Sequence, residues 1–280
     1  MLNRLDDLFA GHDAVLCDVW GVIHNGVTAW PQAHQALSRA REAGLAVVMI
    51  TNAPRPNEPV ARQLLSLGVP QSAFDAVTTS GDVTRALIAA GPRKVLHIGP
   101  ERDLAIFDGL DVELVEEFEA SGAVCTGLYD DTTEGPEDYH DLLQRLRSRD
   151  LPFICANPDI VVDRGGETIY CAGAIARQYT LIGGRTQIAG KPFAPIYDAA
   201  IEKAQAALGR PLDRSRVLAI GDGVLTDVKG AVDYGLGLVF ITDGIHAREY
   251  GEPGRPDPAA LGEWLAKAGA APAGVMTMLA

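Results

Sequence analysis

Six polar residues follow short apolar runs of the chain, and their side chains together suit phosphoryl chemistry. They comprise carboxylates, a hydroxyl, an amide and an ammonium group: Asp18, Thr51, Asn52, Lys191, Asp222 and Asp227. Carboxylates held close together repel each other unless a cation lies between them, and Mg²⁺ prefers oxygen ligands. We therefore expect a Mg²⁺ site, with Asp18 beside a phosphoryl group whose oxygens contact the lysine and the threonine.

Each of these residues also has an ordinary structural explanation when it is taken alone. An aspartate such as Asp18 after a strand is often a turn residue or a helix N-cap, and Thr51-Asn52 suits a strand-to-helix turn. Lys191 fits a loop, Asp222 precedes glycine in a common turn dipeptide, and Asp227 suits the start of a helix. Only their order and their shared position at the ends of successive strands indicate one site.

The elements that must position these residues alternate along the chain. Apolar, β-branched runs at 14–21 and 45–53 flank a helix-period segment at 31–44, and the same order returns at 215–244. This pattern predicts an α/β fold with a doubly wound parallel sheet, in which ligands bind beyond the carboxyl ends of the strands. We expect residues 1–80 and 186–280 to form this core and residues 81–185 to form an inserted α/β domain.

Composition excludes several classes of partner. The formal net charge of −13 opposes binding to a nucleic-acid backbone. No apolar run reaches the roughly 18 residues of a membrane span, and the first residues lack the pattern of a signal peptide, so we expect a cytoplasmic protein without membrane contact. The four cysteines show no metal-binding spacing, and we expect reduced thiols in apolar cores.

The joint pattern resembles the haloacid dehalogenase (HAD) superfamily, in its class IIA branch of nitrophenyl-, sugar- and nucleotide-phosphatase-like proteins. The segments "DVWGV", "ITNA", "GKP" and "GDGVLTD" look like the four motifs of that family, and "NPD" at 157–159 looks like a segment joining cap and core. The resemblance implies a Rossmann-like core, an α/β cap at 81–185 and a Mg²⁺-dependent phosphatase that acts on a small phosphorylated metabolite. A homodimer formed through the cap is a further expectation.

The resemblance also implies a role for each residue. Asp18 would be the nucleophile that forms an aspartyl-phosphate, Thr51 and Asn52 would contact the phosphoryl group, and Lys191 would neutralise its charge. The Mg²⁺ ligands would be Asp18, Asp222, Asp227 and the backbone carbonyl of Trp20. Gly21 would form a sharp turn close to this site.

One position departs from the family pattern. Phosphatases of this family carry a second aspartate two residues after the nucleophile, which protonates the leaving group, and this chain has Trp20 there. An indole cannot transfer that proton, and general acid–base catalysis contributes about 10²–10⁴-fold.

Three explanations for Trp20 remain open at this point. The substrate has a good leaving group, such as an aryl or acyl phosphate, or His24 supplies the proton because its ordinary pKa suits the task. The third explanation is that the protein has weakened catalysis and serves to bind a phosphorylated ligand or to regulate. Related proteins without this aspartate catalyse other reactions, so a phosphotransferase is a further alternative.

Overall fold

A parallel sheet of six strands forms the larger half of the protein. In the computed structural model, which describes residues 2–280, its strand order is β15-β12-β11-β1-β2-β3. The bounds of these strands are β1 (Ala14–Asp18), β2 (Ala46–Thr51), β3 (Ala76–Thr79), β11 (Val217–Gly221), β12 (Gly237–Ile241) and β15 (Gly274–Met276). The strands come from both ends of the chain, because β1 lies between β2 and β11 and pairs with both in parallel.

Helices cover both faces of this sheet, as a doubly wound fold requires. Along β1, Val15 packs toward α1 (Pro31–Glu42) and α2 (Asn57–Ser66), whereas Leu16 packs toward α6 (Ala194–Leu208). Apolar side chains of α7 (Lys229–Tyr234) and α8 (Pro258–Lys267) continue the second layer over β11 and β12. Side chains alternate between the faces of a strand, so an apolar strand buries both of its faces only between two helical layers. The predicted fold class is confirmed.

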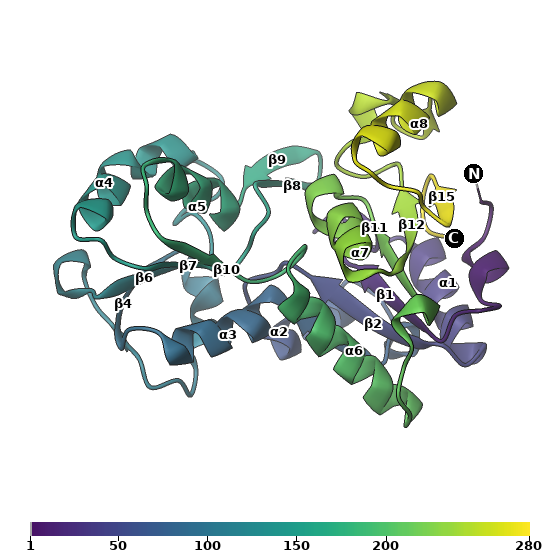
Figure 1. Ribbon diagram of the computed structural model, residues 1–280, viewed down its shortest axis with the longest axis horizontal. Coiled ribbons are helices and arrows are strands. Elements are labelled where there is room, and N and C mark those ends of the chain that lie inside the picture. Colours follow the sequence, from purple (N-terminus) through teal and green to yellow (C-terminus); the bar gives the residue numbers. More distant parts are fainter. Residues whose placement is uncertain (1) are drawn as a thin grey trace.

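A second parallel sheet lies beside the first (Figure 1). Its strand order is β10-β7-β6-β4-β5, with β4 (Lys94–Ile98), β5 (Glu113–Leu114), β6 (Gly122–Cys125), β7 (Phe153–Cys155) and β10 (Thr186–Ile188). The helices of this region are α3 (Ser80–Ala90), α4 (His140–Ser148) and α5 (Ala172–Leu181). Its separate apolar core includes Phe153, Ile175 and Tyr179.

The predicted end of the inserted region needs correction. We expected the core to resume at residue 186, but β10 pairs with β7, so the second sheet extends to Ile188. The segment "TQI" is a strand of three partly exposed residues with no apolar run, which explains why the sequence pattern did not reveal it. We therefore propose a cap that runs from residue 81 to residue 188.

Two short hairpins complete the fold. The hairpin of β8 (Val161–Arg164) and β9 (Glu167–Tyr170) projects from the cap toward the core, where Gly165 donates a backbone hydrogen bond of 3.2 Å to Asn25. The second hairpin consists of β13 (Gly251–Glu252) and β14 (Arg255–Pro256) in the core. The projecting hairpin brings cap residues to the carboxyl ends of the core strands.

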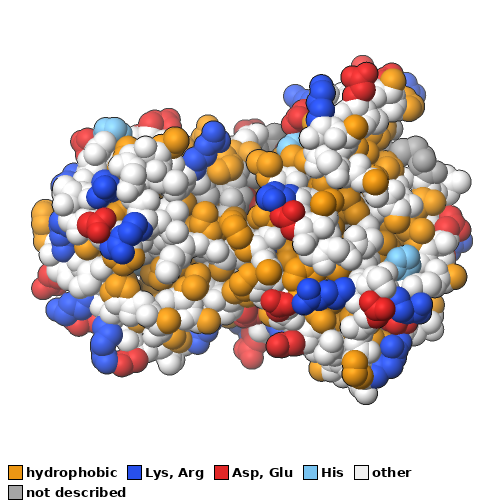
Figure 2. All heavy atoms as spheres, viewed as in Figure 1, with side chains coloured by type: hydrophobic (Ala, Val, Ile, Leu, Met, Phe, Trp, Pro, Cys, Tyr) orange, Lys and Arg blue, Asp and Glu red, His pale blue; other side chains and the backbone are white. Residues whose placement is uncertain are grey.

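The outer surface is mixed in charge. On the face shown in Figure 2, lysine and arginine side chains lie among aspartate and glutamate side chains on both halves of the molecule, and apolar side chains gather where the halves meet. None of the helices within residues 2–280 has the length and apolar character needed to cross a membrane. All four cysteines are free and buried, as the sequence predicted.

We expect Leu37→Ala to destabilise the core by about 2–5 kcal/mol, because Leu37 is fully buried between α1 and the sheet and its removal leaves a cavity. Urea unfolding followed by circular dichroism measures this change. Leu65→Ala is the matched control: Leu65 is 46% exposed on α2, so its loss should cost about 0.5 kcal/mol or less. Equal losses for the two variants would contradict this account of the core.

Candidate active site

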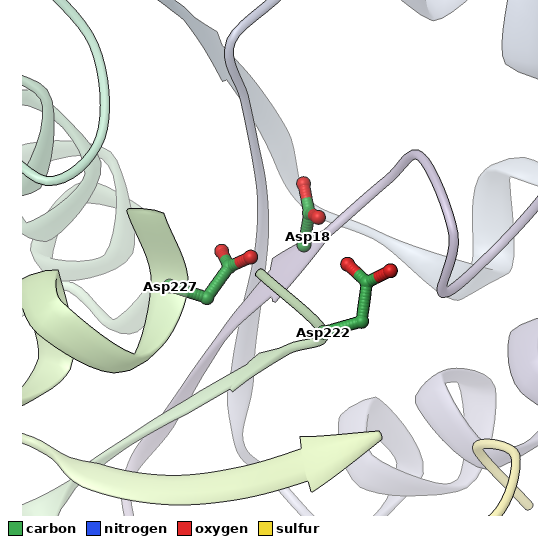
Figure 3. A group of neighbouring side chains, drawn as sticks. All are labelled: Asp18, Asp222 and Asp227. Carbon is green, nitrogen blue, oxygen red and sulfur yellow. The ribbon is translucent and has the colours of Figure 1, made fainter. Parts of the chain in front are cut away.

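Three buried carboxylates meet at the carboxyl end of the large sheet. Asp18 is the last residue of β1, and Asp222 directly follows the neighbouring strand β11. Asp227 lies on a π-helical turn, Val224–Val228, that precedes α7. Each of the three offers an oxygen atom within 4.8 Å of those of the others, and the carboxylates approach one another in Figure 3.

Two glycines allow this close packing. A Cβ atom on Gly21 would lie 2.4 Å from Oδ2 of Asp222, and one on Gly244 would lie 2.1 Å from the same oxygen. Gly21 also has a φ of +82°, a conformation that other residues rarely adopt. The predicted turn at Gly21 therefore has two physical reasons, a left-handed backbone and the space that Asp222 occupies.

Lys191 lies among these carboxylates. Its Nζ atom donates to Oδ1 of Asp18 at 2.5 Å and to Oδ1 of Asp227 at 2.7 Å, and the side chain is almost completely buried. Burial opposes a charge on the lysine, but Asp18 and Asp227 outweigh it and raise the pKa of Lys191 well above its ordinary value. The lysine is therefore an ammonium group at neutral pH.

The cluster has an excess of negative charge. Burial, with the nearby charge of Asp227, raises the pKa of Asp18 well above its ordinary value and that of Asp222 to about 7. When all three carboxylates are ionised, the single ammonium group leaves two negative charges uncompensated, which matches the charge of a divalent cation. Oxygen ligands of this kind suit Mg²⁺. The donor set thus fits the predicted metal, with Asp18, Asp222 and Asp227 as the side chains that would hold it.

The ends of β2 contribute differently from expectation. Thr51 lies at the cleft and its Oγ1 accepts a bond of 3.3 Å from the N–H of Ala53. The amide of Asn52 is occupied by protein: its Oδ1 accepts from the N–H of Lys191 at 2.7 Å, and its Nδ2 donates to Asp159 at 2.8 Å. Asn52 therefore fixes the loop that carries Lys191, while phosphoryl contacts of Thr51 and Asn52 remain predictions.

The sequence interpretation did not give Asp159 a role. This partly buried residue follows the Asn157-Pro158 turn, where Oδ1 of Asn157 accepts from the N–H of Asp159 at 3.0 Å. It lies close enough to the lysine that Lys191 lowers its pKa, although burial is the larger influence and raises it. The "NPD" segment was the sequence signal, because an aspartate held by an Asx turn is fixed in direction.

His24 lines a cavity next to the cleft that holds the carboxylates, and Trp20 lines both. The two rings contact edge to face with centroids 5.2 Å apart, and Nδ1 of His24 accepts a hydrogen bond from the N–H of Gly26 at 2.9 Å. Burial lowers the pKa of His24 to about 4, so the ring is neutral at physiological pH. Its position and its charge state disfavour the hypothesis that His24 protonates the leaving group.

Trp20 connects the core with the cap. It lines the cleft beside Asp18, and its Nε1–H donates a hydrogen bond to the backbone carbonyl of Asp163 in β8. The ring also lies against Gly26, where a Cβ atom would approach the indole to 2.6 Å. Binding of a metal ion by the backbone carbonyl of Trp20 remains a prediction.

Comparisons with known proteins agree with this arrangement. Residues 15–113 match the family described as haloacid dehalogenase-like hydrolase, and residues 188–276 match a family described as HAD-hydrolase-like. A solved hydrolase of the haloacid dehalogenase-like family from Brucella suis 1330 is 57% identical, with a TM-score of 0.91 and full coverage of both chains.

Two further matches come from Mycobacterium tuberculosis. A D-glycerol 3-phosphate phosphatase is 28% identical over 252 residues, which are 87% of this chain and 67% of that protein. A structure of glycerol phosphate phosphatase in complex with magnesium has a TM-score of 0.64 at 23% identity, covering 85% of this chain and 70% of that one. The latter shows similarity of fold.

We expect Mg²⁺ to stabilise the protein more at about pH 7.5 than at about pH 5. The raised pKa of Asp222, about 7, means that the metal-free folded state keeps a proton there between about pH 4 and pH 7 that the unfolded state has released, and the raised pKa of Asp18 acts in the same direction. These groups therefore lower the free energy of unfolding as pH rises through that window. Mg²⁺ binds the deprotonated carboxylates, and thermal melts with and without Mg²⁺ at both values measure the difference.

Asp222→Asn serves as the comparison for that experiment, because it removes one ligand charge while retaining the shape of the side chain. Its melting temperature should respond less to Mg²⁺ at the higher pH. A wild-type response of equal size at both values would show that these carboxylates are not the metal ligands.

Proposed function

Because the chain belongs to the haloacid dehalogenase-like hydrolase family, we propose that it is a Mg²⁺-dependent phosphatase that hydrolyses a small phosphorylated metabolite through Asp18. The observation that carries this proposal is the placement of a buried Asp18 carboxylate beside the Lys191 ammonium and two further carboxylates at one end of the sheet. A lone acid and a lone lysine are common, but this buried combination suits charge stabilisation in phosphoryl transfer.

The Asp18 carboxylate has one oxygen available for attack. Its Oδ1 accepts both from Lys191 and, at 2.8 Å, from the N–H of Val19, while no donor within residues 2–280 bonds to Oδ2. In the proposed reaction a carboxylate oxygen of Asp18 bonds to phosphorus and the bond from phosphorus to the leaving oxygen breaks. Water then attacks the phosphorus of the aspartyl-phosphate, and the bond from phosphorus to the Asp18 oxygen breaks. The proton of the water stays with the phosphate product or passes to solvent, and the free carboxylate is restored.

Lys191, on the loop held by Asn52, neutralises the negative charge of the phosphoryl group. The ammonium is already fixed within hydrogen-bond distance of Asp18, so it needs no reorganisation when negative charge moves to the phosphoryl oxygens. A bound Mg²⁺ supplies additional positive charge that neutralises the phosphoryl oxygens. The cap hairpin lies over the same cleft and limits the access of bulk water.

Trp20 narrows the class of substrate. The indole replaces the usual acid, and His24 is neutral. A strongly basic alkoxide would therefore have to leave without being protonated, which is slow. We therefore infer that the substrate carries a weakly basic leaving group, as aryl and acyl phosphates do. The relative from Mycobacterium tuberculosis is named for glycerol 3-phosphate, an alkyl ester, so this chain and that relative should differ in substrate preference.

We expect Asp18→Asn to reduce phosphate release from phenyl phosphate and acetyl phosphate on the order of 10³-fold or more, because an amide cannot replace the nucleophile. Release of inorganic phosphate in the presence of Mg²⁺ is the measurement. Asp108→Asn is the matched control, since Asp108 is an exposed residue of the cap that lies outside the cleft. Retained activity in Asp18→Asn would remove Asp18 from the role of nucleophile.

We expect Trp20→Asp to raise turnover of alkyl phosphates such as glycerol 3-phosphate by about 10²–10⁴-fold, with a smaller change for phenyl phosphate, because only a basic leaving group needs the acid. The same assay compares both esters in the wild type and the variant. A wild type inactive on every ester, combined with activity in Trp20→Asp, would favour a phosphate-ligand binding or regulatory protein. Inactivity of both would count against a phosphatase.

A further inference from the structure

Two cavities lie between the core and the cap, and they share one wall. The catalytic cleft contains Asp18, Lys191 and the other carboxylates. A second cavity, here called the arginine chamber, is lined by Arg55, Arg102 and Arg164, with His24 and Asp131 among its other residues. The residues common to both linings are Trp20, Thr51, Asp159 and Val162. Of these four, Trp20 has the largest side chain.

The indole of Trp20 is held in place from several directions. Its Nε1–H bonds to the carbonyl of Asp163 in the cap, its ring meets the edge of His24, and the ring lies against Gly26, whose φ is +86°. A Cβ atom on Gly26 would lie 2.6 Å from Cη2 of Trp20, so the glycine leaves space that the ring fills. These contacts hold the indole where the linings of the two cavities meet.

Ion pairs hold the arginines of the chamber, and its lining suits an aromatic group. Arg102 and Arg164 both bond to Asp131, with Nη2–Oδ2 distances of 2.5 and 2.8 Å, and Nε of Arg55 lies 3.8 Å from Oδ1 of Asp103. Apolar side chains, including Val60, Leu128, Val162 and Ile169, complete the lining. Guanidinium groups over an aromatic face, combined with apolar contact, favour a flat ring.

We propose that Trp20 is a specificity-determining residue. Its ring separates the leaving group of a substrate at Asp18 from the arginine chamber, so the protein accepts a leaving group of one ring or less and excludes longer ones. This inference rests on the proposed function, because it takes a phosphoryl group to lie at Asp18. In this inference Trp20 limits the size of the leaving group, in addition to lacking a proton that it could donate.

Removal of the indole should join the two cavities. Trp20→Ala deletes both the ring and the N–H donor, whereas Trp20→Phe keeps a ring in the partition and deletes the bond to Asp163. The two variants therefore distinguish a steric wall from a hydrogen bond that positions the cap hairpin. Trp20→Leu, which retains more apolar volume than alanine, provides a second opening variant if Trp20→Ala does not fold.

The experiment measures the binding of two non-hydrolysable phosphonates with Mg²⁺ by isothermal titration calorimetry. Benzylphosphonate carries one ring, and (4-biphenylyl)methylphosphonate adds a second ring that would extend into the arginine chamber. We expect the wild type to bind the shorter compound more tightly. In Trp20→Ala the ratio of the two dissociation constants should shift toward the longer compound at least tenfold, equivalent to about 1.4 kcal/mol. Trp20→Phe should retain the wild-type preference.

Three results would overturn the proposal. The first is an unchanged ratio of the two dissociation constants in folded Trp20→Ala or Trp20→Leu. The second is a shift of this ratio in Trp20→Phe that is as large as in Trp20→Ala. The third is a wild type that binds neither phosphonate. Phosphate release from phenyl phosphate is measured in parallel. Phosphonate binding with the expected shift but without turnover would contradict the phosphatase function and leave the role of Trp20 intact, so the two failures are distinguishable.

Discussion

The buried ion cluster of Lys191 with Asp18, Asp222 and Asp227 is the constraint on which the rest of the site depends. Charges removed from water are costly unless each has a partner at close range. One ammonium group bonds to two of the carboxylates, and the raised pKa values of Asp18 and Asp222 reflect the negative charge that remains. The parallel pairing of β1 with β11, the close approach of Gly21 and Gly244 to Asp222, and the Asn52 bond to the lysine loop all maintain this spacing.

The cap and the core cooperate at the same cleft. Asp159 in the segment that leads into β8 accepts from Asn52, and Gly165 and Asp163 in the cap hairpin bond to the core segment that follows β1. These contacts join residues far apart in the sequence at the place where the core strands end. The groups that we propose to be catalytic thus come from the core, while Trp20 and residues of the cap hairpin line the same cleft.

Trp20 connects the chemistry of the site with its shape. An aspartate at this position would be small and able to transfer a proton, whereas the indole is large, cannot act as an acid and bonds across to the cap. In the two proposals made above, the indole therefore lacks the proton donor and also forms a partition. We infer that both effects favour a short leaving group that departs without protonation, so the proposed substrate class depends on this one residue.

The sequence determined the fold class and the kinds of group at the strand ends, because apolar periodicity and the residues after each strand are local properties. It did not reveal β10, whose three residues carry no apolar run and become a strand only through pairing with β7. It also could not show that the amide of Asn52 bonds to the backbone of Lys191, that Trp20 bonds to Asp163, or that the ring of His24 lies against that of Trp20. Those contacts join distant segments, and only the packing of the cap against the core decides them.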